Sequence, residues 1–177
     1  YAETFAHGRT ALDIDPADPE RLVVGAGPHV GVVSTSREIW ASPGFVTVKG
    51  ASLNGEAVIA AGARGIKRLA GAALERSEEL RPIAVRRLVT LADGTSLVAS
   101  YTNLMRLVGA DLETIDEGAP IDLSSSPNRE FALLLRERDH ALIRLRSGDA
   151  GIELIGHDEL AEAVAIGNDG EQVFSAR

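Results

Sequence analysis

VTVKGASLNGEAVIAAGARGIKRLAGAAL, residues 46–74, is the segment that the rest of the chain repeats. It predicts, in order, a short strand at 46–48, a loop that ends at Asn54-Gly55-Glu56, an apolar strand at 57–61, a strand at 66–69 and a last segment from Leu74. Asn and Gly at the first turn supply the positive φ angles that tight hairpins require. The segment therefore predicts four short strands in antiparallel order.

The same order of turn and apolar strand recurs along the chain. The residues just before the most apolar strands lie 35 to 41 residues apart, and they are Glu20, Glu56, Thr95, Glu130 and Glu171. Each is followed by a short run of aliphatic and small residues bounded by turns, which is typical of a strand covered on both faces. A repeat of this length predicts an array in which each unit is one small sheet.

The repeat divides the chain into one domain of similar units. We expect them at about 9–44, 45–80, 81–118 and 119–158, with a last unit made of 159–177 together with 1–8. Charged residues enter the fourth strand of each unit, as expected of an edge strand that resists pairing with other chains. A helix at 71–80 or at 157–165 is the competing interpretation, because the first segment is rich in good helix formers.

Composition limits the function. The chain has 177 residues, 45% of them hydrophobic, and no apolar run approaches the roughly 20 residues that span a bilayer. It has no cysteine, which excludes disulfides, thiolate metal ligands and cysteine nucleophiles. Its net charge of −8 disfavours a phosphate backbone as partner unless basic residues gather on one face. We expect a soluble, cytoplasmic protein that binds neither nucleic acid nor a membrane.

Two segments combine an Asn-Gly or Asp-Gly turn with an apolar strand and a small residue, LNGEAVIAAG at 53–62 and LADGTSLVAS at 91–100. In this the chain resembles the WD40/YVTN-like β-propeller superfamily across nearly its whole length. The resemblance implies an all-β fold, a β-propeller-like array of four-stranded antiparallel blades. About 4.75 blades are present, as a small ring or as a fragment of a larger propeller. No Trp-Asp pair ends a third strand, and a β-sandwich or barrel is the alternative.

By that resemblance, the loops joining strands two and three share one face with the loops between blades. Aromatic and arginine residues on such loops are the types enriched at binding hot spots. The binding residues that we expect on this face are Trp40, Arg64, Tyr101, Asn103, Arg136, Arg138 and His140. Other residues on the same loops are His29, Phe45, Glu117, Asp139, His157 and Asp158. Each could instead be an ordinary solvated loop residue, and the charges of 136–140 could simply satisfy one another.

Arg68, Arg106 and Arg144 fall at equivalent places in three third strands. They could line up as a stripe that binds an acidic ligand. Alternatively, they lie over the outer strands with their aliphatic stems covering apolar surface.

The sequence contains none of the local motifs that carry catalysis. It has no Gly-x-Ser-x-Gly elbow, no His-x-x-x-His pair and no calcium-loop pattern. We expect no catalytic residue, no metal and no cofactor. The predicted function is a non-enzymatic scaffold that mediates protein–protein interaction through its loop face, with a protein, or the remainder of its own propeller, as partner. The alternatives are a propeller-type hydrolase or lactonase with a channel metal, and a structural piece of a larger propeller-containing protein.

Overall fold

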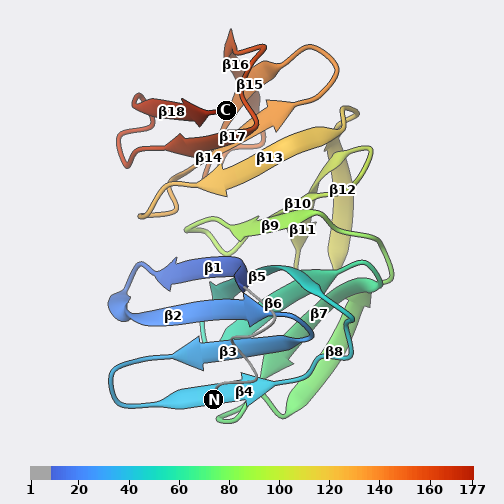
Figure 1. Ribbon diagram of the computed structural model, residues 1–177, viewed down its shortest axis with the longest axis vertical. Coiled ribbons are helices and arrows are strands. Elements are labelled where there is room, and N and C mark those ends of the chain that lie inside the picture. Colours follow the sequence, from blue (N-terminus) through green and yellow to red (C-terminus); the bar gives the residue numbers. More distant parts are fainter. Residues whose placement is uncertain (1–8) are drawn as a thin grey trace. The chain divides into compact units, whose positions relative to one another are not determined.

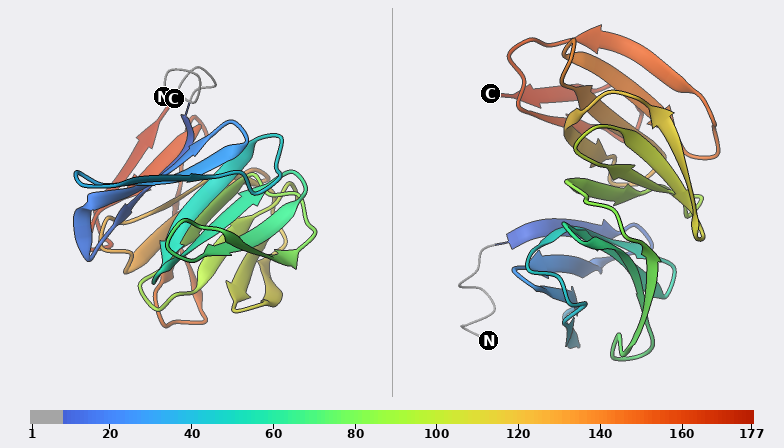
Figure 2. Two further views of the ribbon diagram at one scale, coloured as in Figure 1. Left: turned by 90° about the horizontal axis from the view of Figure 1, so that it is seen from below. Right: turned by 90° about the vertical axis from the view of Figure 1, so that its right-hand side faces the viewer.

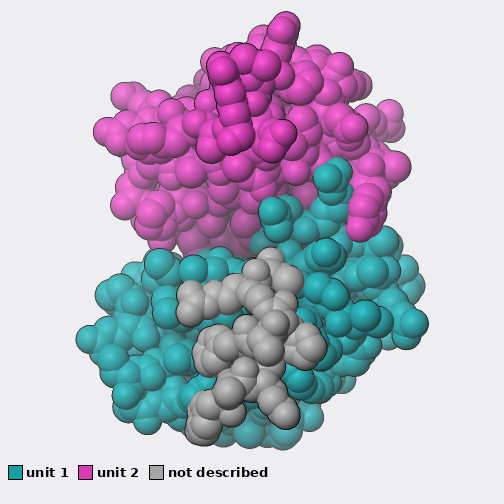
Figure 3. Space-filling model, viewed as in Figure 1, with its two compact units in different colours: residues 1–88 teal, residues 89–177 magenta. Residues whose placement is uncertain are grey.

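The computed structural model describes residues 9–177, and the side chains from Ala11 onward. These residues form eighteen β-strands and no helix (Figure 1). They contain, accordingly, no helical segment that could cross a membrane. The chain divides into two compact units, residues 1–88 and residues 89–177 (Figure 3).

Unit 1 holds two four-stranded sheets, each an antiparallel meander in sequence order. The first contains β1 (Arg9–Asp15), β2 (Asp18–Ala26), β3 (His29–Val33) and β4 (Glu38–Ala41). The second contains β5 (Val48–Asn54), β6 (Ala57–Gly62), β7 (Gly65–Ala70) and β8 (Arg76–Arg81). Each strand within these sheets pairs with its neighbour in the sequence, so every connection is a short turn.

Unit 2 repeats this arrangement twice and adds a smaller sheet. Its first sheet contains β9 (Arg87–Thr90), which begins in unit 1, with β10 (Ser96–Ala99), β11 (Leu104–Val108) and β12 (Asp111–Asp116). Its second contains β13 (Pro120–Ser125), β14 (Phe131–Arg136), β15 (Ala141–Arg146) and β16 (Ile152–His157). The last sheet has two strands, β17 (Ala163–Ile166) and β18 (Val173–Ala176) (Figure 2).

The second strand of each four-stranded sheet is the centre of its core. All six residues of β6 are buried, and so are four of the six residues of β14. Burying one leucine or valine side chain contributes about 1.5–3 kcal/mol, so these strands supply much of the folding free energy of their sheets. Neighbouring sheets share the resulting clusters: Val23 and Val58 lie in one cluster of unit 1, and Leu97 and Leu134 in one of unit 2.

Two strand limits differ from the sequence-based prediction. The first strand of the second sheet is β5, which covers 48–54, where we expected a strand at 46–48 followed by a loop. Small residues allow this strand to lie close to its neighbours: a Cβ on Gly50 would come within 2.7 Å of the Leu88 backbone nitrogen. Asp13 of β1 also holds β5, accepting hydrogen bonds from Ser52 Oγ and from the Leu53 amide.

The fourth strand of the same sheet starts at Arg76 rather than at Leu74. Gly71 and Leu74 have positive φ angles of 95° and 54°, which close a turn instead of extending a strand. The Glu75 carboxylate accepts the Ala73 amide and fixes this turn.

The predicted fold class is confirmed, since the described chain is all-β and built from four-stranded antiparallel sheets. The helical interpretation of 71–80 and 157–165 is wrong, because both segments form strands and turns. The strand expected at 1–8 lies outside the described residues. That both units belong to one domain stays a prediction.

Candidate functional site

Four loops of unit 2 lie at the same end of its strands. They are the turns 100–103 and 137–140 and the inter-sheet links 117–119 and 158–162, which we call the loop surface of unit 2. Strand register places them together: Leu104 pairs with Asp116, and Ala141 pairs with His157. This is the face that the sequence assigns to binding.

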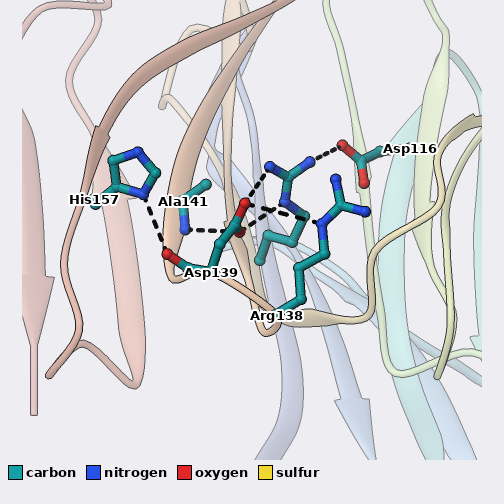
Figure 4. A network of polar contacts seen from close by, with 6 residues as sticks. Asp116, Arg138, Asp139, Ala141 and His157 are labelled. Carbon is teal, nitrogen blue, oxygen red and sulfur yellow. Dashed lines mark hydrogen bonds and ion pairs between the residues drawn. The ribbon is translucent and has the colours of Figure 1, made fainter.

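Arg136 ties two of these loops to the neighbouring sheet. Its Nη1 donates to Asp116 Oδ2 at 2.6 Å, while its Nε and Nη2 donate to Asp139 at 2.9 and 2.6 Å (Figure 4). The side chains of Arg136 and Asp116 are only 11% and 4% exposed. Gly118 leaves no room for a side chain beside them. The guanidinium therefore fastens the end of β12 to the end of β14 and to the turn that follows.

The charges of this turn satisfy one another, as one of the two interpretations of 136–140 predicts. The hydrogen bond from Arg136 lowers the pKa of Asp139 from 3.8 to about 2, and the Ala141 amide adds to the effect. The Asp139 hydrogen bond in turn raises the pKa of Arg136. Glu137 and Arg138 are exposed; the Arg138 side chain is 60% exposed and lies 3.9 Å from Asp139.

The turn that carries Tyr101 is held by a buried serine. Ser100 Oγ accepts the amides of Thr102 and Asn103 at 3.1 and 2.9 Å and donates to the Asn103 carbonyl at 3.0 Å. These short-range bonds shape the turn without using any group of the tyrosine side chain. Tyr101 is 54% exposed at the tip of the turn. An aromatic side chain is thus displayed on a fixed backbone.

The link 158–162, which leads to the last sheet, is fixed to the turn 137–140. His157 Nδ1 lies 3.1 Å from the Asp139 carbonyl (Figure 4). The Asp158 amide donates to the His140 carbonyl at 3.0 Å. Asp158 Oδ2 accepts Ser175 Oγ of β18 at 2.6 Å, and this bond lowers the pKa of Asp158. Polar contacts therefore run from β12 to β18 beneath the loop surface of unit 2.

The structure brings most of the sequence-predicted site residues together in unit 2. Those on its loop surface are Tyr101, Asn103, Arg138 and His140, and Arg136 ends the strand β14 directly before the turn 137–140. Arg136 is largely covered and positions the loops, whereas Tyr101 and Arg138 are exposed.

The remaining two predicted residues belong to unit 1. Arg64 lies in the exposed turn between β6 and β7. Trp40 lies within strand β4, half-buried over Gly31, and its Nε1 donates to Glu38 Oε1 at 2.5 Å.

Sequence reasoning missed Asp116 and Leu160. Asp116 ends a fourth strand that contains several charges, and nothing in the sequence distinguishes it from those that are solvated. Leu160 is 56% exposed in the link 158–162 and adds an apolar side chain to the loop surface of unit 2.

The three equivalent arginines do not form a free stripe. Arg68, Arg106 and Arg144 stand opposite glutamates of the fourth strands, which are Glu78, Glu113 and Glu153. Two of them also reach the next sheet. Arg106 Nη2 donates to the Asp149 carbonyl at 2.9 Å, and Arg144 Nη1 donates to the Gly170 carbonyl at 2.5 Å. These side chains thus stabilise the contact between sheets. Within residues 9–177, no three His, Cys, Asp or Glu side chains gather in a way that could hold a metal ion.

Comparisons with known proteins identify the fold. No protein-family model matches the sequence, and no curated protein resembles it closely enough to count as a relative. Among solved structures, a chain of the nidogen/laminin complex superimposes with a TM-score of 0.74 at 13% identity, over 96% of this chain and 72% of that one. Kuenenia stuttgartiensis hydrazine synthase superimposes with a TM-score of 0.66 at 12% identity, over 94% of this chain. The extracellular domain assigned to a hybrid two component system of B. thetaiotaomicron gives 0.60 at 14% identity, over 92% of this chain and 24% of that one.

These likenesses establish a β-propeller fold. The chain spans about half of the hydrazine synthase chain, 55% of its length. In all, 646 chains of solved structures are similar to it, so the fold by itself does not indicate an activity.

Proposed function

We propose that this propeller is a non-enzymatic scaffold that binds a protein partner through the loop surface of unit 2. The observation that carries the proposal is the display of Tyr101 and Arg138 on turns that internal bonds hold in place. Tyrosine and arginine are enriched at the energetic centres of protein interfaces. A partner that meets preformed loops does not have to order them, which lowers the entropic cost of binding.

Charge and shape support a protein over other ligands. The net charge of −8 opposes binding to nucleic acid or to an anionic membrane. Leu160 adds apolar area beside the polar residues, in the mixture common at such interfaces. One protein of the same fold is part of a complex between nidogen and laminin. The remainder of a larger propeller is a second possible partner, and the cytoplasm is the compartment that we propose from the cysteine-free sequence.

Site-specific photo-crosslinking in cells tests this proposal. A benzophenone amino acid replaces Tyr101 in one variant, Arg138 in a second, and Ala110 in a control variant. Ala110 is exposed in the turn between β11 and β12, at the other end of the strands of unit 2. We expect the same protein adduct from positions 101 and 138 and none from position 110. Equal adducts at all three positions would show that the loop surface of unit 2 has no special role.

A further inference from the structure

Within residues 9–177, no strand pairs with the outer edge of β18. In each of the four larger sheets, the second strand pairs with a third strand on the side away from the first. β18 is the second strand of its sheet, and no described residue pairs with its outer edge. An open edge exposes backbone donors and acceptors that can take up another strand.

The hydrogen-bond pattern shows which groups are exposed there. The Gly167 amide donates to the Gln172 carbonyl at 2.8 Å, so these two residues form a hydrogen-bonded pair of the ladder between β17 and β18. Because such pairs alternate along an antiparallel ladder, the N–H and C=O groups of Val173 and Ser175 point to the open edge. Phe174, between them, leaves 59% of its surface exposed.

A groove lies between the turn that leads into β18 and the neighbouring sheet. Its volume is about 380 Å³, and its walls include Phe131 and Ile152 from the neighbouring sheet and Asp169 and Glu171 from the turn that leads into β18. Phe131, Leu142 and Ile155 pack against the cluster shared by β14 and β17 but are only partly buried. Apolar surface thus remains uncovered where a third strand of the last sheet would run.

The charges of the groove indicate the character of that strand. Arg144 is already paired with Glu153, at 2.7 and 3.0 Å, and with the Gly170 carbonyl. The other charged residues of the groove are Arg146, Asp149, Asp169 and Glu171. Three carboxylates against one guanidinium leave a negative potential at this end of β18.

We propose that the open edge of β18 and this groove bind an extended segment of another protein, added antiparallel to β18 as a third strand. Its side chains alternate so that apolar residues cover Leu142 and Ile155, and its C-terminal end carries a lysine or arginine. The antiparallel direction places that end beside Val173, and therefore beside Asp169 and Glu171. This is addition of a strand to a sheet edge, a common mode of peptide recognition.

The chain's own third strands have the same character. Three of the four contain one or two basic residues, IKRL at 66–69, LMRL at 104–107 and IRLR at 143–146, and Arg146 ends the last of them. The expected ligand is thus a strand of the type that three of the four complete sheets already hold. The surface is distinct from the loop surface of unit 2, so either proposal can fail without the other.

A labelled peptide tests the inference. The probe is DHALIRLRSG, the sequence of β15 with its flanking residues, and a scrambled peptide of the same composition is the control. Fluorescence anisotropy should show saturable binding of the probe to the protein and no binding of the scrambled peptide. Amide exchange at Val173 and Ser175 should slow about tenfold or more when the probe is bound. Glu171→Lys should weaken binding about three- to fivefold, whereas Glu130→Lys, at the equivalent place before β14, should leave it unchanged.

Three results would overturn the inference. The first is binding of the probe without slower exchange at Val173 and Ser175. The second is protection of these amides in the free protein that rises with protein concentration, which would assign the edge to a second copy. The third is protection in the free protein that is lost when residues 1–8 are removed, which would assign it to the chain's own N-terminal segment.

Discussion

Arg136 and Asp116 are joined by an ion pair, with Nη1 2.6 Å from Oδ2, although twenty residues separate them in the sequence. The pair connects the last strand of one sheet to the second strand of the next. The same guanidinium holds Asp139, and the Asp139 carbonyl in turn contacts His157. A largely covered arginine therefore sets the position of the turn that carries Arg138, one of the residues that we propose for binding.

Replacing this arginine should destabilise unit 2. Arg136→Met removes the charge but keeps much of the aliphatic stem, so Asp116 is left covered and unpaired. Loss of one partner of a buried pair costs about 3 kcal/mol, measurable as a lower midpoint of urea unfolding. Arg138→Met is the matched control: its side chain is 60% exposed, and the expected change is below about 0.5 kcal/mol. Equal effects of the two substitutions would contradict the role given to Arg136.

Acid should weaken the same contact over a defined range of pH. The folded protein holds the pKa of Asp139 at about 2, below its ordinary 3.8, because Arg136 donates a hydrogen bond to the ionised carboxylate. A lowered pKa stabilises the fold above pH of about 4, and this contribution is lost as the pH falls toward 2. The variant Asp139→Asn lacks this contribution of the ionised carboxylate to the stability of the fold. The difference in unfolding free energy between the two proteins should be constant from about pH 5 to 7 and shrink below pH 4. A constant difference down to pH 2 would rule out the coupling.

Arg144 should hold the last sheet against its neighbour. Its guanidinium bonds both Glu153 and the Gly170 carbonyl, a geometry that a lysine cannot reproduce. Arg144→Lys should therefore lose about 1.5–3 kcal/mol of local stability, seen as faster amide exchange at Ala165 and Gly167, whose N–H groups point toward β18. Arg146→Lys is the control, because Arg146 is exposed and its contact is with the Phe131 ring. Unchanged exchange at both amides in Arg144→Lys would refute this role.

Gly31 should be necessary for the position of Trp40. A Cβ on Gly31 would lie 2.7 Å from the indole ring, so Gly31→Ala must displace it. Trp40 is the only tryptophan, and its fluorescence emission should shift to longer wavelength as the ring becomes more exposed. The expected loss of stability is about 1–3 kcal/mol, typical of overpacking. Gly156→Ala should change neither property, because its added Cβ would meet only Leu142 Cδ1 at 3.9 Å. An unshifted emission in Gly31→Ala would show that the indole packs elsewhere.

The fold was predictable because its signals are local and repeated. Asn54-Gly55 and the turns like it mark hairpins, and the apolar run after each marks a central strand. The same reasoning failed at β5, where Gly50 and Ser52 resemble loop residues. Their strand pairs with β6 and also packs against Leu88 and Asp13, which are far away in the sequence.

The candidate site was predictable in part for the same reason. The repeat places Tyr101 and Arg138 on equivalent turns, and the resemblance to β-propellers implies that these turns share one face. That Arg136 is covered could not be predicted, because its burial depends on Asp116 in another sheet. Whether an arginine on a turn binds a partner or holds the loops is decided by a contact that no local pattern encodes.

The binding affinity of the partner captured by crosslinking tests the central claim most directly. Tyr101→Ala combined with Arg138→Ala removes the two exposed side chains and leaves the Arg136 contacts in place. Val108→Ala combined with Asp111→Ala is the control, since both residues are exposed near the other end of the strands. Calorimetric titration should show affinity reduced about 100-fold or more in the first pair, with an unchanged melting temperature, and full affinity in the second. Full affinity in the first pair would contradict the proposal that the loop surface of unit 2 binds the partner.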